Sequence, residues 1–294
     1  MASIRSKLFS LILRLLIKGK LEKELVTGNI NRKRDVPTPP TKLQQKFKIS
    51  TKQINGKNVF TLSPKNNVNN KTVLYLHGGA YIHNFAKQHW NFIETLIESL
   101  QCCIVAPDYP LAPNYTYEES FAFVEPLYKE LAVNNNSDDF IIMGDSAGGG
   151  FALALAQKMK KENLSQPSQI VLLSPWLDIS MSNPGISEIE PKDPFLEIKG
   201  LQLAGEAYAG KTDVDNYLLS PINGQLEGLG KICLFIGTHD ILFADAKRFK
   251  ALCDSIGVDI SYYEYKEMIH CWMLLGFPES RKAIQQIVDE VMAQ

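Results

Sequence analysis

The chain has 294 residues, of which 45% are hydrophobic and 21% are charged, as in an ordinary globular protein. This balance excludes a disordered, collagen-like or low-complexity chain. The formal net charge is −1 at pH 7, so we expect no nucleic-acid partner held by the charge of the whole protein. The five cysteines lack C-x-x-C spacing, which predicts neither a disulfide framework nor a metal site and fits a reducing, cytoplasmic location.

The N-terminal region is far more basic than the rest of the chain. Residues 1–34 hold nine lysines and arginines against two glutamates, a surplus of seven that leaves −8 for the remainder. Apolar residues recur at helical spacing over 4–16, and Arg14 interrupts a run that is too short to span a bilayer. No small-x-small cleavage site follows, which argues against a signal peptide. We expect a helix packed on the body of the protein, with peripheral membrane contact as the less favoured alternative.

The elements expected after this helix alternate between short apolar strands and helices. Residues 29–42 form a connector, and Asn55-Gly56 predicts a hairpin of strands 46–50 and 58–63. The pattern then predicts strands at 73–76, 102–106, 140–143, 170–173, 232–236 and 260–265, and helices at 90–100, 117–133, 151–160, 246–256 and 278–292. This order indicates an α/β fold: a mostly parallel sheet with an antiparallel N-terminal edge and helices on both faces.

Residues 179–230 interrupt the alternation. They contain Asn183-Pro184-Gly185, further prolines and a helical stretch at 196–209. Open α/β sheets bind ligands at the carboxyl ends of their strands, so we interpret the segment as an insertion over that edge. No linker between independent domains is evident. We therefore expect a single domain over 1–294.

The strongest chemical signal is Gly144-Asp145-Ser146-Ala147-Gly148, which matches G-x-S-x-G. An apolar strand leads into the motif and an alanine-rich helix leads out of it. This is the strand–turn–helix elbow that exposes a serine nucleophile at the edge of a sheet. The sequence therefore predicts Ser146 as a catalytic nucleophile, with the following helix N-terminus favouring negative charge beside it.

A second signal, His77-Gly78-Gly79-Ala80, follows the first expected parallel strand and matches the H-G-G-G-type loop of esterases and lipases. Glycines let backbone N–H groups approach a substrate oxygen. We expect an oxyanion hole formed by the N–H groups of Gly78, Gly79 and Ala147. We interpret His77 as a brace for the loop, and His83 and His89 as loop or surface residues.

The chain order Ser, acid, His predicts the rest of a catalytic triad. Asp240 directly follows an expected strand, whereas Asp245 falls in the next helix and suits a capping role. His270 follows the last expected strand, on a loop at the same sheet edge. We predict Asp240 as the acid and His270 as the base, and do not favour His239.

These motifs, with Asp108-Tyr109-Pro110-Leu111-Ala112-Pro113, resemble the α/β-hydrolase fold and, within it, the hormone-sensitive-lipase-like esterases. That family usually has Arg in place of Pro110 and often Glu in place of Asn114. Both departures lie outside the catalytic set. The resemblance implies a helical cap made from the N-terminal helix and an inserted segment. This agrees with our separate interpretation of about 1–30 and 179–230.

The predicted function is that of a serine hydrolase, a carboxylesterase or lipase-like enzyme that cleaves small-molecule esters through an acyl-enzyme. We expect short acyl chains, because the inserted segment carries no long apolar run to line a deep tunnel. No cofactor or metal is expected. One alternative is an amidase of the arylformamidase type on the same triad. Another is a non-catalytic ligand-binding protein on a hydrolase scaffold, against which the presence of His270 argues.

Overall fold

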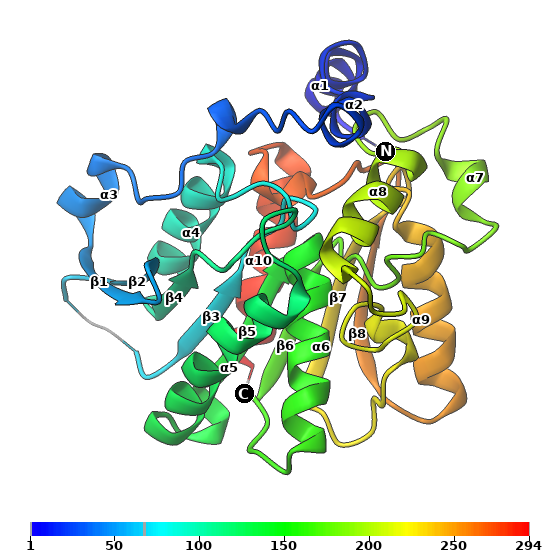
Figure 1. Cartoon of the computed structure of the whole chain (residues 1–294). Helices are drawn as coiled ribbons and strands as arrows, with labels where there is room; N and C mark the ends of the chain where they lie inside the picture. The colour runs from blue at the N-terminus through cyan, green and yellow to red at the C-terminus, as the bar shows by residue number, and fades with distance from the viewer. Residues whose placement is uncertain (1, 67–68, 294) are drawn as a thin grey trace.

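The computed structural model of the protein describes residues 2–66 and 69–293. Within these residues the centre of the fold is an eight-stranded sheet in the order β1-β2-β4-β3-β5-β6-β7-β8 (Figure 1). The strands are β1 (Lys48–Ile54), β2 (Lys57–Ser63), β3 (Thr72–Leu76), β4 (Cys103–Pro107), β5 (Phe140–Asp145), β6 (Gln169–Leu173), β7 (Lys231–Gly237) and β8 (Ile260–Tyr265). Strands β1, β2 and β4 pair antiparallel, and every pairing from β4 to β8 is parallel. The predicted antiparallel edge is therefore confirmed.

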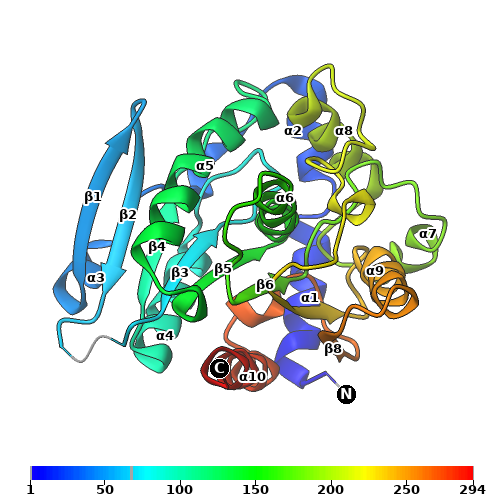
Figure 2. The ribbon, with the colours of Figure 1, turned by 90° about the horizontal axis from the view of Figure 1, so that it is seen from below.

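Helices cover both faces of the sheet, as expected (Figure 2). They are α1 (Ile4–Leu16), α2 (Lys20–Thr27), α3 (Thr41–Lys46), α4 (Lys87–Leu100), α5 (Tyr117–Asn134), α6 (Ala147–Lys161), α7 (Ile186–Ile189), α8 (Ile198–Ala209), α9 (Phe243–Ser255) and α10 (Pro278–Met292). Strand residues alternate between two buried clusters. Leu74 and Leu76 of β3 pack with the helices of one face, α5 and α6 among them, and Val73 and Tyr75 pack with α4 and α10 on the other.

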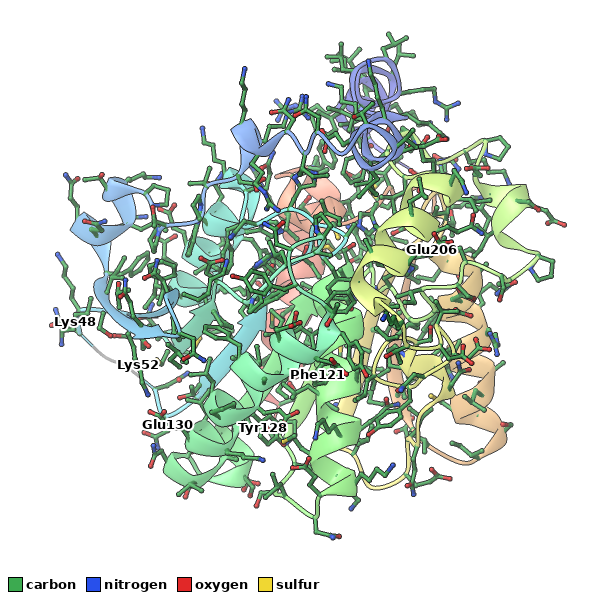
Figure 3. All side chains as sticks on the ribbon, in the orientation of Figure 1. Lys48, Lys52, Phe121, Tyr128, Glu130 and Glu206 are labelled. Atoms are coloured by element: carbon green, nitrogen blue, oxygen red, sulfur yellow. The ribbon has the colours of Figure 1, made fainter. Side chains whose placement is uncertain are left out.

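The β1–β2 hairpin at the sheet edge also contacts helix α5 through an ion pair. Lys52 of β1 and Glu130 of α5, both labelled in Figure 3, form an ion pair at 2.8 Å. The pair is exposed at both ends, so its contribution to stability is at most about 1 kcal/mol.

Several helices differ from their predicted bounds. Helix α6 begins four residues earlier than predicted, directly after Ser146, because its opening glycines are helical and hide the apolar period. Helices α2 and α3 were not predicted as separate elements. Gly19, in a left-handed conformation with φ +84°, separates α1 from α2. A helix of eight residues such as α2 has too few turns for a clear period, and its packing against α8 supports it instead.

The N-terminal helices lie at the carboxyl ends of the parallel strands, at the top of Figure 1. Helix α2 packs against α8 of the inserted segment. Two basic side chains also reach that segment. Arg14 donates to the backbone oxygen of Pro191 at 2.8 Å, and Lys18 donates to those of Glu190 and Asp193 at 2.7 and 2.8 Å. Hence the two regions expected to form a cap are joined to each other. None of the helices described is long and apolar enough to cross a membrane.

Candidate active site

Ser146 lies in a sharp turn between strand β5 and helix α6. Its φ of 53° and ψ of −122° form a conformation that costs a non-glycine residue about 1–3 kcal/mol and persists only where the surroundings hold it. A Cβ on Gly144 would lie 2.2 Å from the Gly148 oxygen, and one on Gly148 would lie 2.0 Å from the Leu76 oxygen. Only glycine fits at both positions. The strand–turn–helix elbow expected from the motif is therefore present.

Asp240 and His270 meet at the same end of the sheet, on the loops that follow β7 and β8. Nδ1 of His270 lies 2.8 Å from Oδ2 of Asp240, and both side chains are buried. Asp245 lies instead in the first turn of α9, where its Oδ1 accepts a hydrogen bond from Asn183 Nδ2 at 2.8 Å. The structure thus pairs Asp240 with the imidazole and gives Asp245 another partner.

Two opposing effects act on the His270 imidazole. Burial alone would lower its pKa, but the Asp240 carboxylate raises it, and the pKa of His270 lies well above its ordinary value of 6.5. The neighbouring Cys271 thiol is neutral at physiological pH, because burial raises its pKa to about 11. Asp240 is therefore the group that favours a positive charge on this ring.

Nε2 of His270, the nitrogen that faces away from Asp240, lies 3.4 Å from Cys271 Sγ. The contacts within the described residues include no hydrogen bond between this nitrogen and Ser146 Oγ. Such bonds are often long in unliganded hydrolases and shorten when substrate binds. Ser146 is 8% and His270 5% exposed, so both lie in a nearly closed part of the molecule.

The glycine loop differs from expectation at Gly78. Its N–H donates to Asp145 Oδ1 at 3.0 Å and is therefore already engaged, which contradicts its expected place in the oxyanion hole. A Cβ on Gly78 would lie 2.3 Å from Asp145 Oδ2, and one on Gly79, whose φ is +122°, would lie 2.4 Å from the His83 oxygen. Glycine at these two positions lets the loop lie directly against the elbow.

Asp145 connects the elbow to the glycine loop, a role the sequence analysis missed. It is 2% exposed, and its Oδ1 also accepts a hydrogen bond from the Tyr75 hydroxyl at 2.6 Å. Burial alone would raise the pKa of Asp145, but His89 and the Tyr75 hydroxyl together outweigh this effect and lower it. The signal available in the sequence was an acidic residue at the end of an otherwise apolar strand, a position that requires polar partners.

His89 is the second of these partners, and the expectation of a loop or surface residue was wrong. It is buried, and its Nδ1 accepts a hydrogen bond from the Ala86 N–H at 2.8 Å. Nε2 therefore carries a proton and donates to Asp145 Oδ2 at 3.2 Å. The sequence pattern around His89 does not reveal its burial, because its contact with Asp145 joins residues 56 positions apart.

His77 behaves as the expected brace. It is fully buried, its Nδ1 lies 2.7 Å from the Gly78 oxygen, and its ring stacks on Tyr109 with centroids 4.4 Å apart. Burial lowers its pKa to about 3, so the ring is neutral. It has no contact with Ser146 among the described contacts and does not compete with His270.

The inserted segment reaches His270 and the loop of Asp240 through Asp193 and Phe195. The Asp193 carboxylate accepts hydrogen bonds from the N–H groups of Phe195 (2.7 Å), Leu196 (2.9 Å) and Ile241 (2.9 Å). The Phe195 ring stacks on His270, with centroids 5.8 Å apart and planes inclined by 24°. Burial and the nearby Asp240 raise the pKa of Asp193 to about 6. The segment is thus anchored on the loop that carries Asp240.

The described residues contain no cluster of three or more His, Cys, Asp or Glu side chains that could hold a metal ion.

Comparison with known proteins places this architecture in a family. A family model of the alpha/beta hydrolase fold matches residues 73–274, which is more than half of the chain. The chain belongs to this family. The predicted resemblance to the α/β-hydrolase fold is confirmed.

Two curated relatives of this chain are named as an esterase and an acetyl-hydrolase. An esterase of Acinetobacter venetianus is 29% identical over 222 residues, which is 74% of this chain and 73% of that protein. An acetyl-hydrolase of Streptomyces hygroscopicus is 27% identical over 218 residues, 73% of each chain. Among solved structures, the HSL-homolog EstE7 from a metagenome library superposes with a TM-score of 0.84 at 22% identity, over 100% of this chain and 99% of that one. The predicted carboxylesterase-like hydrolase agrees with these relatives.

Proposed function

We propose that this protein is a serine hydrolase that cleaves carboxylic esters through a covalent acyl-enzyme, with Ser146, His270 and Asp240 as its triad. The proposal rests on two features that lie together at one edge of the sheet. One is the strained elbow at Ser146, and the other is the 2.8 Å contact between His270 and Asp240. A reducing, cytoplasmic location is part of the proposal, because all five cysteines are free.

In the first half of the proposed reaction, Ser146 Oγ attacks the ester carbonyl carbon while Nε2 of His270 takes the hydroxyl proton. Asp240 stabilises the imidazolium that forms and fixes its tautomer through Nδ1. The tetrahedral intermediate then collapses, the carbon–oxygen bond to the alcohol breaks, and His270 gives its proton to the departing alkoxide. Water attacks the acyl-enzyme with His270 again as base, and the acid leaves Ser146 free.

The oxyanion would be held by backbone N–H groups of the glycine loop and of Ala147. The N–H groups of Gly79 and Ala80 make no hydrogen bond among the described contacts, and Ala147 is the first residue of α6. We propose Gly79 and Ala147, with Ala80 in place of Gly78, as the donors. Loss of one such donor typically costs about 3–4 kcal/mol of transition-state stabilisation.

We propose that residues of about 1–30 and 179–230 act as a cap and that short acyl chains are preferred. Ser146 is only 8% exposed. Tyr81, next to the glycine loop, stacks on Tyr208 of α8 with centroids 3.7 Å apart and also on Trp176, and all three rings are buried. Packed aromatic rings around the site leave little room for a long chain. A misfit methylene costs about 1–3 kcal/mol in such a pocket.

A panel of p-nitrophenyl esters from acetate to palmitate tests this function. We expect hydrolysis that falls steeply beyond about eight carbons, since each further methylene must be fitted into a closed site. Ser146→Ala should lose roughly 10⁶-fold in kcat with an unchanged melting temperature, because the side chain takes no part in packing the core. A p-nitroanilide measured in parallel separates an esterase from an amidase. Equal rates on palmitate and acetate would contradict the acyl-chain proposal, and more than a tenth of activity in Ser146→Ala would contradict the nucleophile.

A further inference from the structure

Helix α1 carries two apolar faces, and within the described residues only one of them packs against a buried cluster. The inner face holds Phe9 and Leu13, which pack on the cluster beside α10, with Phe9 and Phe277 ring centroids 5.4 Å apart. Ser6 on the same face is buried. The packing of this face, together with the hydrogen bonds of Arg14 and Lys18 to residues 190–193, holds the helix in its place.

The opposite face holds four large apolar side chains, here called the outer ridge: Ile4, Leu8, Leu11 and Leu15, which are 87, 59, 56 and 76% exposed. Their spacing of four, three and four residues places them one above the other on a single helix face. Ile12 and Leu16, 44 and 58% exposed, widen the ridge on one side. Figure 3 shows side chains of α1 standing away from the body at the top of the molecule.

A contiguous apolar surface of this kind normally marks a binding surface. Exposure of this apolar surface to water is unfavourable in free energy, in proportion to its area. A helix that is apolar on both faces is expected where a second apolar phase lies opposite the protein core.

Basic side chains line the flanks of the ridge. Lys7 and Arg14, seven residues apart, share one flank, and with Lys192 and His239 they line a pocket of about 430 Å³ that also contains Glu267. Burial lowers the pKa of His239, and although Glu267 opposes this, the charges of Lys192, Lys7 and Arg14 lower it further. Lys7 pairs with Glu267 at 3.4 Å, but three basic side chains line the pocket against this one carboxylate. The pocket beside the ridge therefore carries a net positive charge and is suited to anionic groups.

The ridge also lies on a particular side of the molecule. Helix α1 is at the carboxyl ends of the parallel strands, the same end as Ser146, and Arg14 and Lys18 tie it to residues 190–193 of the inserted segment (Figure 1). A flat partner that bound the ridge would face the end of the sheet where the triad lies.

We propose that α1 docks this protein on an anionic lipid surface, with the outer ridge between the lipids and the basic pocket facing their headgroups. Apolar insertion combined with basic flanks is the arrangement of helices that bind in the plane of a membrane interface. A second copy of the chain fits less well, because pairing two such helices would bring two basic flanks together. The proposal does not depend on the proposed ester hydrolysis.

Co-sedimentation of the full chain with vesicles tests this docking. We expect binding to vesicles of phosphatidylcholine with 30% phosphatidylglycerol and at least about tenfold weaker binding to phosphatidylcholine alone, since each basic residue near an anionic surface contributes about fivefold. Leu8→Gln/Leu15→Gln should weaken binding at least about tenfold, because two leucines no longer enter the apolar phase. Glutamine keeps the helix propensity close to that of leucine.

Val133→Gln/Met292→Gln is the matched control, since both side chains are exposed, at 84 and 51%, and lie on other helices. It should bind vesicles like the unchanged protein. Lys7→Gln/Lys192→Gln should bind anionic vesicles more weakly and neutral vesicles equally. Near-ultraviolet circular dichroism confirms folding of each variant independently of any activity.

Three results would overturn the proposal. The first is unchanged binding by Leu8→Gln/Leu15→Gln, and the second is equal binding to neutral and anionic vesicles. The third is a protein that binds no vesicles but dimerises in sedimentation velocity, with the dimer lost in Leu8→Gln/Leu15→Gln. That outcome would assign the ridge to a second copy of the chain. Esterase activity plays no part in these readouts, so failure of the proposed function would be recognised separately.

Discussion

At the scale of single residues, the contacts of Asp240 and Asp245 distinguish the carboxylate that orients His270 from the one that does not. Asp240 lies 2.8 Å from His270, whereas Asp245 is held by Asn183. Asp240→Asn should cost about 10⁴-fold in kcat, because an amide in this place favours the wrong imidazole tautomer. Asp245→Asn serves as the matched control and should retain most of the activity. The steady-state rate of p-nitrophenyl acetate hydrolysis by the two variants checks this prediction. A larger loss of kcat in Asp245→Asn than in Asp240→Asn would show that Asp240 is not the acid of the triad.

The same pair of residues predicts how activity depends on pH. His270 accepts a proton only when neutral, and its pKa lies well above 6.5 because of Asp240. The kcat/KM of the free enzyme should therefore rise with pH, and the midpoint of its acidic limb should lie above 6.5. Asp240→Asn removes the charge and should move that midpoint to lower pH. A midpoint at or below 6.5 in the unchanged protein would contradict this electrostatic account.

The local geometry of a residue could be predicted from the sequence where a motif fixes it. The turn at Ser146 is such a case, since strand, glycines and helix follow one another along the chain. Gly78 and His89 are not, because Asp145 holds both of them through contacts that span 67 and 56 positions. Whether the Gly78 N–H is free depends on a partner that no spacing rule specifies.

At the scale of elements, Asp193 ties the inserted segment to the loop that carries Asp240. Its carboxylate is fully buried and accepts three backbone N–H groups. Asp193→Ala leaves these donors unpaired, and a loss of at least about 3 kcal/mol of unfolding free energy is expected at 1–3 kcal/mol for each. Phe195 should also lose its place against His270, so kcat should fall.

Asp193→Asn keeps one acceptor oxygen and should be intermediate in urea-unfolding free energy. Thermal or urea unfolding measured with kcat on the same samples checks both effects. An Asp193→Ala protein as stable and as active as the original would show that the segment is held by its other contacts instead.

Elements were predictable where the chain alternates clearly between buried strands and amphipathic helices. The strands β3, β5, β6 and β7 follow this rule, and their continuous apolar runs are typical of strands buried on both faces. Helices α2 and α3 are short, and tertiary packing supports them more than periodicity does. That packing is visible for α2, whose Leu21 and Leu25 lie against the main buried cluster.

At the scale of the whole molecule, the N-terminal region should affect activity without contacting Ser146, Asp240 or His270. Helix α2 packs on α8, and α8 carries Tyr208, which stacks on Tyr81 beside the glycine loop. Deleting residues 1–28 should expose α8 and loosen the aromatic cluster. We expect lower kcat/KM on short esters and weaker discrimination against long ones.

The matched control is deletion of residues 1–16, which removes α1 but leaves α2 and its packing on α8. It should retain discrimination between short and long esters. Both proteins can be assayed on the acetate-to-palmitate panel. If the deletion of 1–28 left acyl-chain preference unchanged, the N-terminal region would not belong to the cap.

The central claim is that Ser146 is the nucleophile of a triad with His270 and Asp240. Fluorophosphonate labelling followed by peptide mass spectrometry tests it most directly, since the reagent forms a bond only with an activated serine. We predict one label per chain, on the peptide that contains Ser146, and strongly reduced labelling in Asp240→Asn. Labelling of another serine, or none in a folded protein, would contradict the account.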